Sequence, residues 1–581
     1  MYIERVPNRK SPPAVLLRES WREGGKTKKR TIGNLSSADD ETIEVLRAAL
    51  KREVVPAGHA IVDPEGVIGC RDSRQHGHVA AIVAMIKRTG LLRAIDRKAS
   101  RERDIVVAMI ADRLLHGDSK LATARHCRKE TAATTLGELL SLEDLDEHEC
   151  YAAMDWLLGR QESIQKKLAK KHLGDGEPLL FDLSSSYFEG HTCPLAKHGY
   201  SRDKRGDLPQ VNYGMYCNGD GVPIGVEVLA GNENDHVAFP KAVARARKDF
   251  GCENVIFVGD RGMISGKAID EYLRGEEGAG WITALNSTSI RKLQNQGDIQ
   301  LSLFDERDLA TITSADYPGE RLIVCRNPLL ADERARKREA LLAATEKLLT
   351  KVKAKVDRRR NPIRGRAEIG VEVGKVVNRK KVAKHFDITI NDDRFEFSRN
   401  QEKIDAEASL DGIYVIRSNV EPEKMTDEQV VAHYKNLALV ERAFRSLKSI
   451  DIRVRPIHHR LADRVRSHIF ICMLAYYVEH HMRTLLAPLM FVDEEKSPAD
   501  ARESVVSPAP RSDSARKKDA TRQNEHGFPL SSFRDILENL SSIMRLTVSV
   551  EDHPADDFRT TSRPSIYQQE IIRHLGLERQ M

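Results

Sequence analysis

The sequence predicts an α/β protein in which a mixed sheet, flanked by helices, is interrupted by an insertion. The first observation is the order of segments between residues 176 and 290, which reads strand, hairpin, helix, strand, helix, strand. The second is that apolar runs such as Val255–Val258 are short and continuous, which is typical of buried strands. The third is the length of 581 residues, which exceeds a single hydrophobic core and predicts several domains.

The region before the sheet divides into two parts. Residues 1–75 alternate as short strands around a basic turn, GGKTKKRTIG. This part is either a small β element that contacts DNA or a solvated hairpin. Residues 76–175 carry the periodicity of helices. They fit a helix-turn-helix-like DNA reader and a helical bundle without groove contacts equally well, and no recognition helix can be identified.

Two aspartates follow apolar strands in the sheet domain, which we place at residues 176–290 and 425–490. The strand in EPLLFDLSSSYFEG is predicted to end at Asp182, and the strand Val255–Val258 runs out at Asp260. Sites of open α/β sheets are built where strands end. A single carboxylate at such a position is more often a turn former or a helix cap. The presence of two favours a functional site.

A third acidic residue, Glu441, lies on the segment Thr426–Lys448, which the sequence predicts to be one amphipathic helix. Glu441 stands at the edge of the apolar stripe of this helix, and a solvated face with an ion pair between Glu441 and Arg445 is the alternative interpretation. The apolar stripe consists of Leu437, Val440, Phe444 and Leu447, and the polar residues near Glu441 are Tyr434, Arg442, Arg445 and Lys448.

The remaining regions are an insertion and a tail. Residues 291–424 interrupt the sheet domain, and Leu342, Leu349 and Val356 stand seven residues apart in their charged part, which predicts a helix or a helical hairpin followed by strands. Residues 491–581 are predicted to be a disordered linker, as far as about Phe528, and a C-terminal tail, because the linker is rich in Ser, Pro, Ala and charge.

Composition limits the class of protein. The net charge is only +6, but the segments 351–384 and 442–466 are strongly basic. Such concentrated charge suggests contact with a polyanion, although charge runs are more often solvated faces. Eight cysteines without a Cys-x-x-Cys pair fit reduced thiols in a cytosol rather than a disulfide framework or a zinc site. We find no signal peptide, and the most apolar run, Ile469–Val478, is too short to span a membrane.

Three carboxylates suggest a particular chemistry. Asp182, Asp260 and Glu441 offer hard oxygen ligands, which suit Mg²⁺ or Mn²⁺ rather than zinc. Cleavage of phosphodiesters often uses two such ions, one for the nucleophile and one for the leaving oxygen. Cationic side chains beside Glu441 would hold DNA phosphates. No Ser-His-Asp set, Gly-rich phosphate loop or Cys/His cluster competes with this assignment.

Four segments, taken in order, resemble the DDE transposases of bacterial insertion sequences, in the group with a Tyr-Arg-Glu-Lys signature. They are FDLSSSYFEG, GYSRDKRGDLPQVNYG, VIFVGDRGM and HYKNLALVERAFRSLK. The resemblance implies a ribonuclease H-like catalytic domain, metal ligation and catalysis by Asp182, Asp260 and Glu441, and cleavage at transposon ends with strand transfer. Tyr434 and Lys448 fall on the signature's Tyr and Lys, which contact DNA near the cut.

The resemblance also implies partners. These are double-stranded DNA with terminal inverted repeats, target DNA, and a second copy of the chain on paired ends, in the bacterial cytoplasm at the nucleoid. The signature's Arg is Leu437 here, which leaves the phosphate contact and any hairpin intermediate open, although Arg442 or Arg445 could supply the charge. A nuclease or resolvase without strand transfer, and a non-catalytic DNA-binding descendant of a transposase, are the alternative functions.

Overall fold

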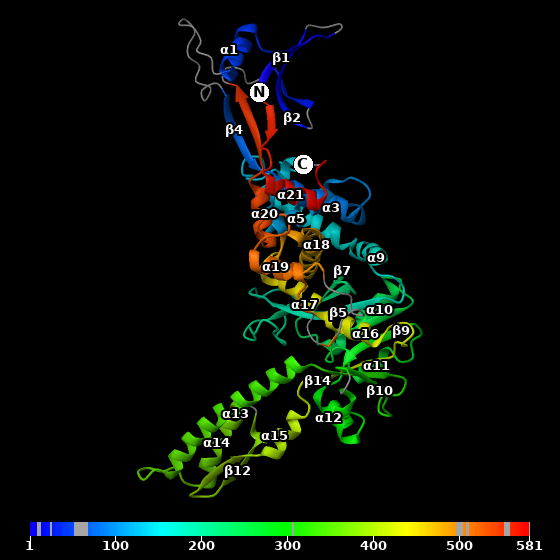
Figure 1. Ribbon diagram of the computed structural model, residues 1–581, viewed down its shortest axis with the longest axis vertical. Helices are drawn as coiled ribbons and strands as arrows, with labels where there is room; N and C mark the ends of the chain where they lie inside the picture. The colour runs from blue at the N-terminus through cyan, green and yellow to red at the C-terminus, as the bar shows by residue number, and fades with distance from the viewer. Residues whose placement is uncertain are drawn as a thin grey trace. The chain divides into compact units, whose positions relative to one another are not determined.

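The computed structural model describes the chain except for residues 9–12, 24–25, 52–67, 305–306, 381, 496–503, 507–509, 551–557 and 580–581. The chain forms two compact units, whose elements are coloured by residue number in Figure 1. We name them the helical unit and the sheet unit. The helical unit comprises Met1–Ile164, Ser446–Glu494 and Ser514–Met581, and the sheet unit comprises Gln165–Arg445 and Glu495–Asp513.

The sheet unit is built on an eight-stranded sheet with the order β10-β11-β14-β9-β8-β5-β6-β7. Its strands are β5 (Pro178–Tyr187), β6 (Gln210–Asn218), β7 (Pro223–Ala230), β8 (Val255–Val258), β9 (Ala279–Ala284), β10 (Leu309–Ile312), β11 (Arg321–Arg326) and β14 (Ile413–Ser418).

Strand directions make this sheet mixed. The strands β5, β8 and β9 are parallel, whereas β6 is antiparallel to β5 and to β7. The order β7-β6-β5-β8-β9 with these directions is that of a ribonuclease H-like sheet. The helices that connect or flank the strands are α9 (Gln161–His172), α10 (Asp235–Lys248), α11 (Gly266–Tyr272), α12 (Ser287–Gln296), α16 (Asp427–Lys435) and α17 (Leu437–Arg445). The predicted fold class is confirmed.

The insertion is shorter than the sequence predicted. The range 291–424 contains β10, β11 and β14, which extend the main sheet instead of forming a separate body. Arg417 on β14 donates to both carboxylate oxygens of the buried Glu320, at 2.6 and 2.5 Å, which fixes β14 beside the start of β11. The separate part of the insertion consists of α13 (Pro328–Asp357), α14 (Arg366–Lys380), a 3-10 turn (Ala383–His385), β12 (Phe386–Ile390), β13 (Phe395–Arg399) and α15 (Gln401–Ala408).

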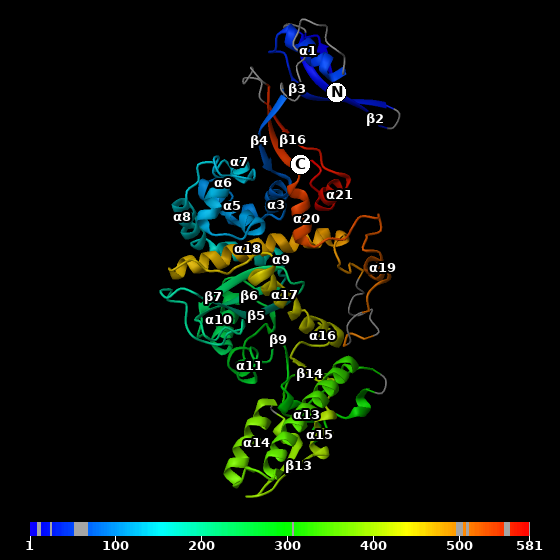
Figure 2. The ribbon, with the colours of Figure 1, turned by 90° about the vertical axis from the view of Figure 1, so that its left-hand side faces the viewer.

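The helices α13 and α14 form the expected helical hairpin (Figures 1 and 2). Leu342, Leu349 and Val356, the residues with seven-residue spacing, are all buried in its core. Ile369, Val373 and Val377 of α14 belong to the same core. The periodicity therefore identified the buried face of this insertion correctly.

The helical unit surrounds one long apolar helix, α18 (Ala462–Leu486). We predicted that residues 425–490 lie wholly in the sheet domain, but α18 packs against α5 and α8 of the helical unit. A helix that is apolar around its circumference needs cover on every side, and a bundle provides it. The other helices are α3 (Gly77–Arg88), α4 (Leu91–Ile95), α5 (Arg101–Leu115), α6 (Lys120–Cys127), α7 (Leu136–Leu140), α8 (Glu147–Leu158), α20 (Phe533–Ser541) and α21 (Ile566–Leu575).

Two small sheets complete this unit. The first joins β1 (Tyr2–Val6), β2 (Ala14–Glu23) and β3 (Lys26–Asn34), and α1 (Asp40–Lys51) packs on β1. The second has the order β16-β15-β4, in which β4 (Ile68–Gln75) pairs with β15 (Met544–Val550), and β15 pairs with β16 (Phe558–Thr561). The tail therefore contributes strands that the sequence did not predict.

The prediction of a disordered linker up to about Phe528 is partly wrong. Residues 496–503 and 507–509 lie outside the described residues. Beyond them, α19 (Asp513–Thr521) is helical, and the ammonium of Lys518 is buried against both carboxylate oxygens of Glu494 at 2.6 Å. An ion pair whose lysine is buried gives this polar segment an anchor that composition does not reveal. Within the described part of the chain, no helix has the length and apolar character needed to span a bilayer.

Candidate active site

Asp182 lies in the middle of a strand and not at its end, which corrects the prediction. The strand β5 continues to Tyr187, because the hydroxyl groups of the serine run find partners in the interior. Ser186 Oγ bonds Tyr213 Oη at 2.9 Å, and Ser185 Oγ accepts the backbone N–H of Arg202 at 3.0 Å. The polar run therefore stays in the sheet, and Asp182 is half-buried on it.

Asp260 follows the neighbouring parallel strand β8. Leu180 on β5 is paired with Val258 on β8, so Asp182 and Asp260 both stand two residues further along adjacent strands. Asp260 Oδ1 accepts the backbone N–H groups of Gly262 and Met263, at 3.0 and 2.8 Å. Its other oxygen, Oδ2, accepts no hydrogen bond from the described residues. Asp260 is thus a turn former with one carboxylate oxygen available.

Glu441 is carried by a helix that packs on β5, but this helix is not the single one predicted. The segment breaks at Asn436 into α16 and α17, and a π-helical turn, Ser446–Ile450, follows. Asn436 Nδ2 donates to the carbonyl of Gly219 at 2.9 Å, a tertiary contact at the break. The Phe444 ring packs edge-on against Tyr213 of β6 with centroids 5.8 Å apart.

The predicted apolar stripe of this segment is largely buried, and most of its polar residues are exposed. Val440, Phe444 and Leu447 are buried and Leu437 is half-buried, whereas Glu441, Arg442 and Arg445 are exposed. Among the described residues Glu441 forms no ion pair, so the structure lacks the alternative Glu441–Arg445 pair. Lys448 lies in the π-helical turn, which belongs to the helical unit.

Tyr434 lies under the influence of two of the three acidic residues. Burial raises the pKa of the Tyr434 phenol, and the negative charges of Asp260 and Glu441 raise it further. Tyr434 therefore lies within the electrostatic range of both carboxylates. The structure brings Asp182, Asp260, Tyr434 and Glu441 to one region of the sheet unit.

Asp182 is the most strongly perturbed of these groups. Burial raises the pKa of its carboxyl to about 7, and the charges of Asp260 and Asp235 act in the same direction. The backbone N–H of Leu183, which donates to Asp182 Oδ1 at 2.8 Å, and the charge of Arg202 oppose the shift. A carboxylate that is disfavoured by neighbouring carboxylates is in a suitable environment for a cation.

The sequence did not single out Asp235 and Arg202. Asp235 is the first residue of α10, a place where an acidic residue normally serves the helix terminus. Arg202 Nη2 donates to Asp235 Oδ1 at 2.8 Å and so holds a positive charge beside the acidic group. The sequence offered one indication that Arg202 lies near the site, because Arg202 is part of the segment GYSRDKRGDLPQVNYG, one of the four that carry the family resemblance.

The oxygen atoms of Asp182, Asp260 and Glu441 are suitable ligands for a hard divalent cation. Three carboxylates offer oxygen atoms, and one of them is disfavoured as an anion in the absence of a cation. Within the described residues, the one group of three with ligand atoms within 4.8 Å of each other is elsewhere, at Asp112, His116 and His126. In that group, Asp112 accepts hydrogen bonds from both imidazoles and from Thr123, which accounts for its arrangement.

Comparison with known proteins gives the family. Residues 177–478 match the family described as Transposase DDE domain, and residues 3–55 match the IS1634 family transposase, N-terminal domain. No curated protein matches the chain. A cryo-EM structure of the piggyBac transposase synaptic complex with hairpin DNA is 10% identical over 82% of this chain and 84% of that chain, with a TM-score of 0.22. Because the first match spans more than half of the sequence, the chain belongs to the DDE transposases, of the kind encoded by bacterial insertion sequences.

Proposed function

We propose that this transposase binds the ends of its insertion sequence, cleaves a phosphodiester at each end and joins the 3′ ends to target DNA. The observation that carries the proposal is the placement of Asp182 and Asp260 at matching positions beyond the paired residues Leu180 and Val258, with Glu441 on the helix α17 that packs on β5. Such a cluster of carboxylates is costly without a compensating cation. The family match to the DDE domain over residues 177–478 supports the same reading.

Asp182, Asp260 and Glu441 would hold two divalent ions, Mg²⁺ or Mn²⁺. When bound, such ions supply a more acidic attacking water and neutralise the leaving oxygen. Asp182 would use the oxygen that does not accept the Leu183 N–H, and Asp260 would use Oδ2. Glu441, exposed on α17, would supply the third carboxylate.

The neighbouring side chains have separate proposed roles. Arg202 is a positioning residue, because its guanidinium is bound to Asp235 and lowers the cost of an ionised Asp182. Tyr434, beside Asp260 and Glu441, would contact the DNA next to the cut. Arg442 and Arg445 are exposed and would bind backbone phosphates in place of the signature's Arg. Lys448 would bind a phosphate as the signature's Lys does.

The partners follow from this activity. We propose that two copies of the chain act on paired ends with terminal inverted repeats, in the bacterial cytoplasm at the nucleoid. The DNA on both sides of the gene should carry short inverted repeats. Their absence would favour a nuclease without strand transfer or a DNA-binding protein without chemistry.

The decisive variant is Asp260→Asn. An amide oxygen can accept the N–H groups of Gly262 and Met263, so the turn should persist while the charge is lost. We expect the variant to fold and to bind end DNA, but not to nick or join it. Asp270→Asn is the matched control, because Asp270 is an exposed acidic residue of α11 with a surface ion pair to Arg274.

The assay is nicking of a labelled end substrate in Mg²⁺, Mn²⁺ or Ca²⁺, with binding measured in parallel. Ca²⁺ should permit binding with little cleavage, because its looser coordination positions the reacting groups poorly. Losses in Asp182→Asn and Glu441→Gln should not add to the loss in Asp260→Asn, because the three residues act as one unit. Near-normal nicking by Asp260→Asn would falsify the assignment.

A further inference from the structure

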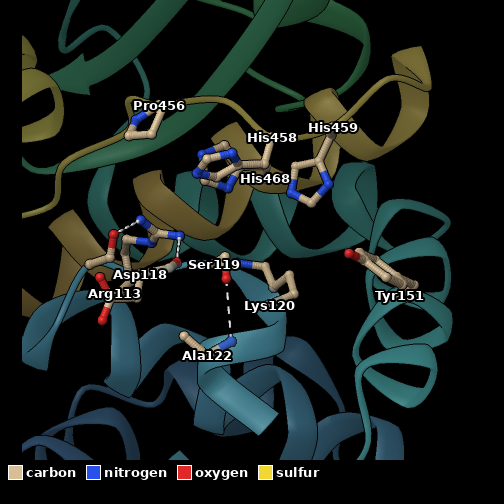
Figure 3. A pocket seen from close by; sticks show the side chains of 11 residues that line it. Arg113, Asp118, Ser119, Lys120, Ala122, Tyr151, Pro456, His458, His459 and His468 are labelled. Carbon is tan, nitrogen blue, oxygen red and sulfur yellow. Dashed lines mark hydrogen bonds between the residues drawn. The ribbon is translucent and has the colours of Figure 1, made fainter. Parts of the chain in front are cut away.

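A second site lies in the helical unit, away from the carboxylates. A cavity of about 290 Å³ opens between the start of α6, the α8 helix and the segment that leads into α18 (Figure 3). Several side chains that line it carry nitrogen atoms. The basic and aromatic residues that line it are Arg113, Lys120, Tyr151, His458, His459 and His468.

Lys120 is the central feature of this cavity. Its side chain is only 2% exposed, yet its ammonium has no hydrogen bond or ion pair with any residue in the described part of the chain. Burial, followed by the positive charge of Arg113, lowers the pKa of Lys120 to about 8. Figure 3 shows Lys120 on one wall and the three imidazoles on the opposite wall. An ammonium in this position lacks a counter-charge.

Arg113 adds a second buried charge that is not neutralised. Its guanidinium donates to the backbone carbonyls of Gly117, Asp118 and Arg453, at 2.6, 2.7 and 3.2 Å. These acceptors satisfy its N–H groups but carry no net charge. The nearby carboxylate of Asp112 is occupied by His116, His126 and Thr123. That of Asp118, at the exposed rim, forms no ion pair with either cation among the described residues.

The opposite wall carries the three imidazoles. His468 Nε2 donates to the carbonyl of Val454 at 2.9 Å, so in the neutral ring the buried Nδ1, which has no partner among the described residues, is an acceptor. Burial, followed by the charge of Lys120, lowers the pKa of His459 to about 3. Ser119, Lys120 and Ala122 line the cavity, so the first turn of α6, which Ser119 caps, borders it. Two buried cations and the N-terminus of a helix therefore face the same cavity.

We propose that this cavity binds a phosphate group and that Lys120 and Arg113 provide its counter-charge. The inference rests on the proposed function in taking this phosphate to be part of DNA; a free phosphate is the other source of the same chemistry. A volume of 290 Å³ is about ten times that of a liquid water molecule, at about 30 Å³. The cavity therefore has room for a phosphate with its adjoining sugar.

The test compares Lys120→Met with Lys98→Met in the full-length protein. Methionine keeps the length of the stem without the charge, and Lys98 is an exposed lysine of the same unit. Binding is measured to an end-containing duplex over a salt series and, separately, to inorganic phosphate at constant ionic strength. We expect Lys120→Met to weaken DNA binding at least tenfold, to lower the slope of log affinity against log salt by about one and to abolish phosphate binding. Lys98→Met should change none of these.

Each outcome has a distinct meaning. Loss of phosphate binding with unchanged DNA binding supports the site and assigns it to free phosphate. Unchanged binding of both ligands overturns the proposal. Phosphate at low millimolar concentration and constant ionic strength, where its general stabilising effect is negligible, should also raise the melting temperature of the wild type. This measurement tests the site even if Lys120→Met fails to fold, and no rise would likewise overturn it. Neither readout involves nicking, so Asp260→Asn can fail its own test while this site stands, and the reverse.

Discussion

Asp182→Asn should make the metal-free transposase more stable at alkaline pH. Burial, with a smaller effect from the neighbouring carboxylates, raises the pKa of the Asp182 carboxyl from 3.8 to about 7. An asparagine removes the charge that the fold disfavours. Its amide oxygen can still accept the N–H of Leu183, the bond that Asp182 Oδ1 accepts at 2.8 Å.

The magnitude follows from linkage. Below pH 3.8 the carboxyl is protonated in the folded and unfolded states, so it costs nothing. Between pH 3.8 and about 7 the unfolded chain ionises while the folded protein keeps the proton, so stability falls progressively; above about 7 both states are ionised and the loss is complete. A pKa moved from 3.8 to about 7 corresponds to about 4 kcal/mol of unfavourable free energy. We expect about 2–4 kcal/mol, because Asp182 is only half-buried and solvent screens part of the repulsion.

The assay is chemical unfolding in EDTA at pH 5 and pH 8.5. Trp281 of β9 is a buried reporter of the sheet unit, and replacing Trp21 and Trp156 with phenylalanine leaves it as the single tryptophan. The advantage of Asp182→Asn over its parent should be complete at pH 8.5 and only about 0.4 times as large at pH 5. Mg²⁺ should stabilise the parent more than the variant. An equal advantage at both pH values would refute the electrostatic argument.

Two further predictions concern DNA. Lys448→Ala should cost at most about 0.5 kcal/mol of stability but lower end cleavage at least tenfold, about 1.4 kcal/mol. Leu437→Arg should raise cleavage, because it restores the signature. Unchanged cleavage in both variants would contradict the roles inferred from the resemblance. Affinity for an end-containing duplex should fall steeply with salt, because the basic segments 351–384 and 442–466 release counterions from phosphates; a flat dependence would remove the polyanion argument.

Local patterns predicted most of the sheet. The run Val255–Val258 is β8 as expected, and the alternation of strands and helices between residues 178 and 286 is observed. The seven-residue spacing in α13 identified a buried face. These successes share a cause, since each depends on residues that are neighbours in sequence.

Features that depend on distant partners were missed. The predicted helix Thr426–Lys448 breaks at Asn436, whose side chain bonds Gly219, more than two hundred residues earlier. The pairing of β4 with β15 joins segments more than four hundred and fifty residues apart. No periodicity within either segment encodes such a partner, so the extent of the insertion and the fate of the tail were also misjudged.

The site shows the same limit. Asp182, Asp260 and Glu441 could be selected because each lies beside an apolar pattern, but the acidic and basic neighbours of Asp182 could not. Asp235 reads as an ordinary first-turn acid, and Arg202 lies in an irregular loop whose backbone N–H is tied to Ser185. Their importance arises from the tertiary position of α10 and that loop, and it becomes visible only through the pKa of Asp182.

For Asp260 the structural and the functional interpretations are compatible. The sequence posed a turn former and a metal ligand as alternatives, but the proposed ligand role would use a different oxygen from the turn. Oδ1 is held by the N–H groups of Gly262 and Met263, which fixes the rotation of the carboxylate. That same fixation determines where Oδ2 lies, so the turn prepares the proposed ligand instead of competing with it. A site built in this way needs no separate element to orient its acid, and it predicts that changes which loosen the turn should impair cleavage even when the carboxylate is kept.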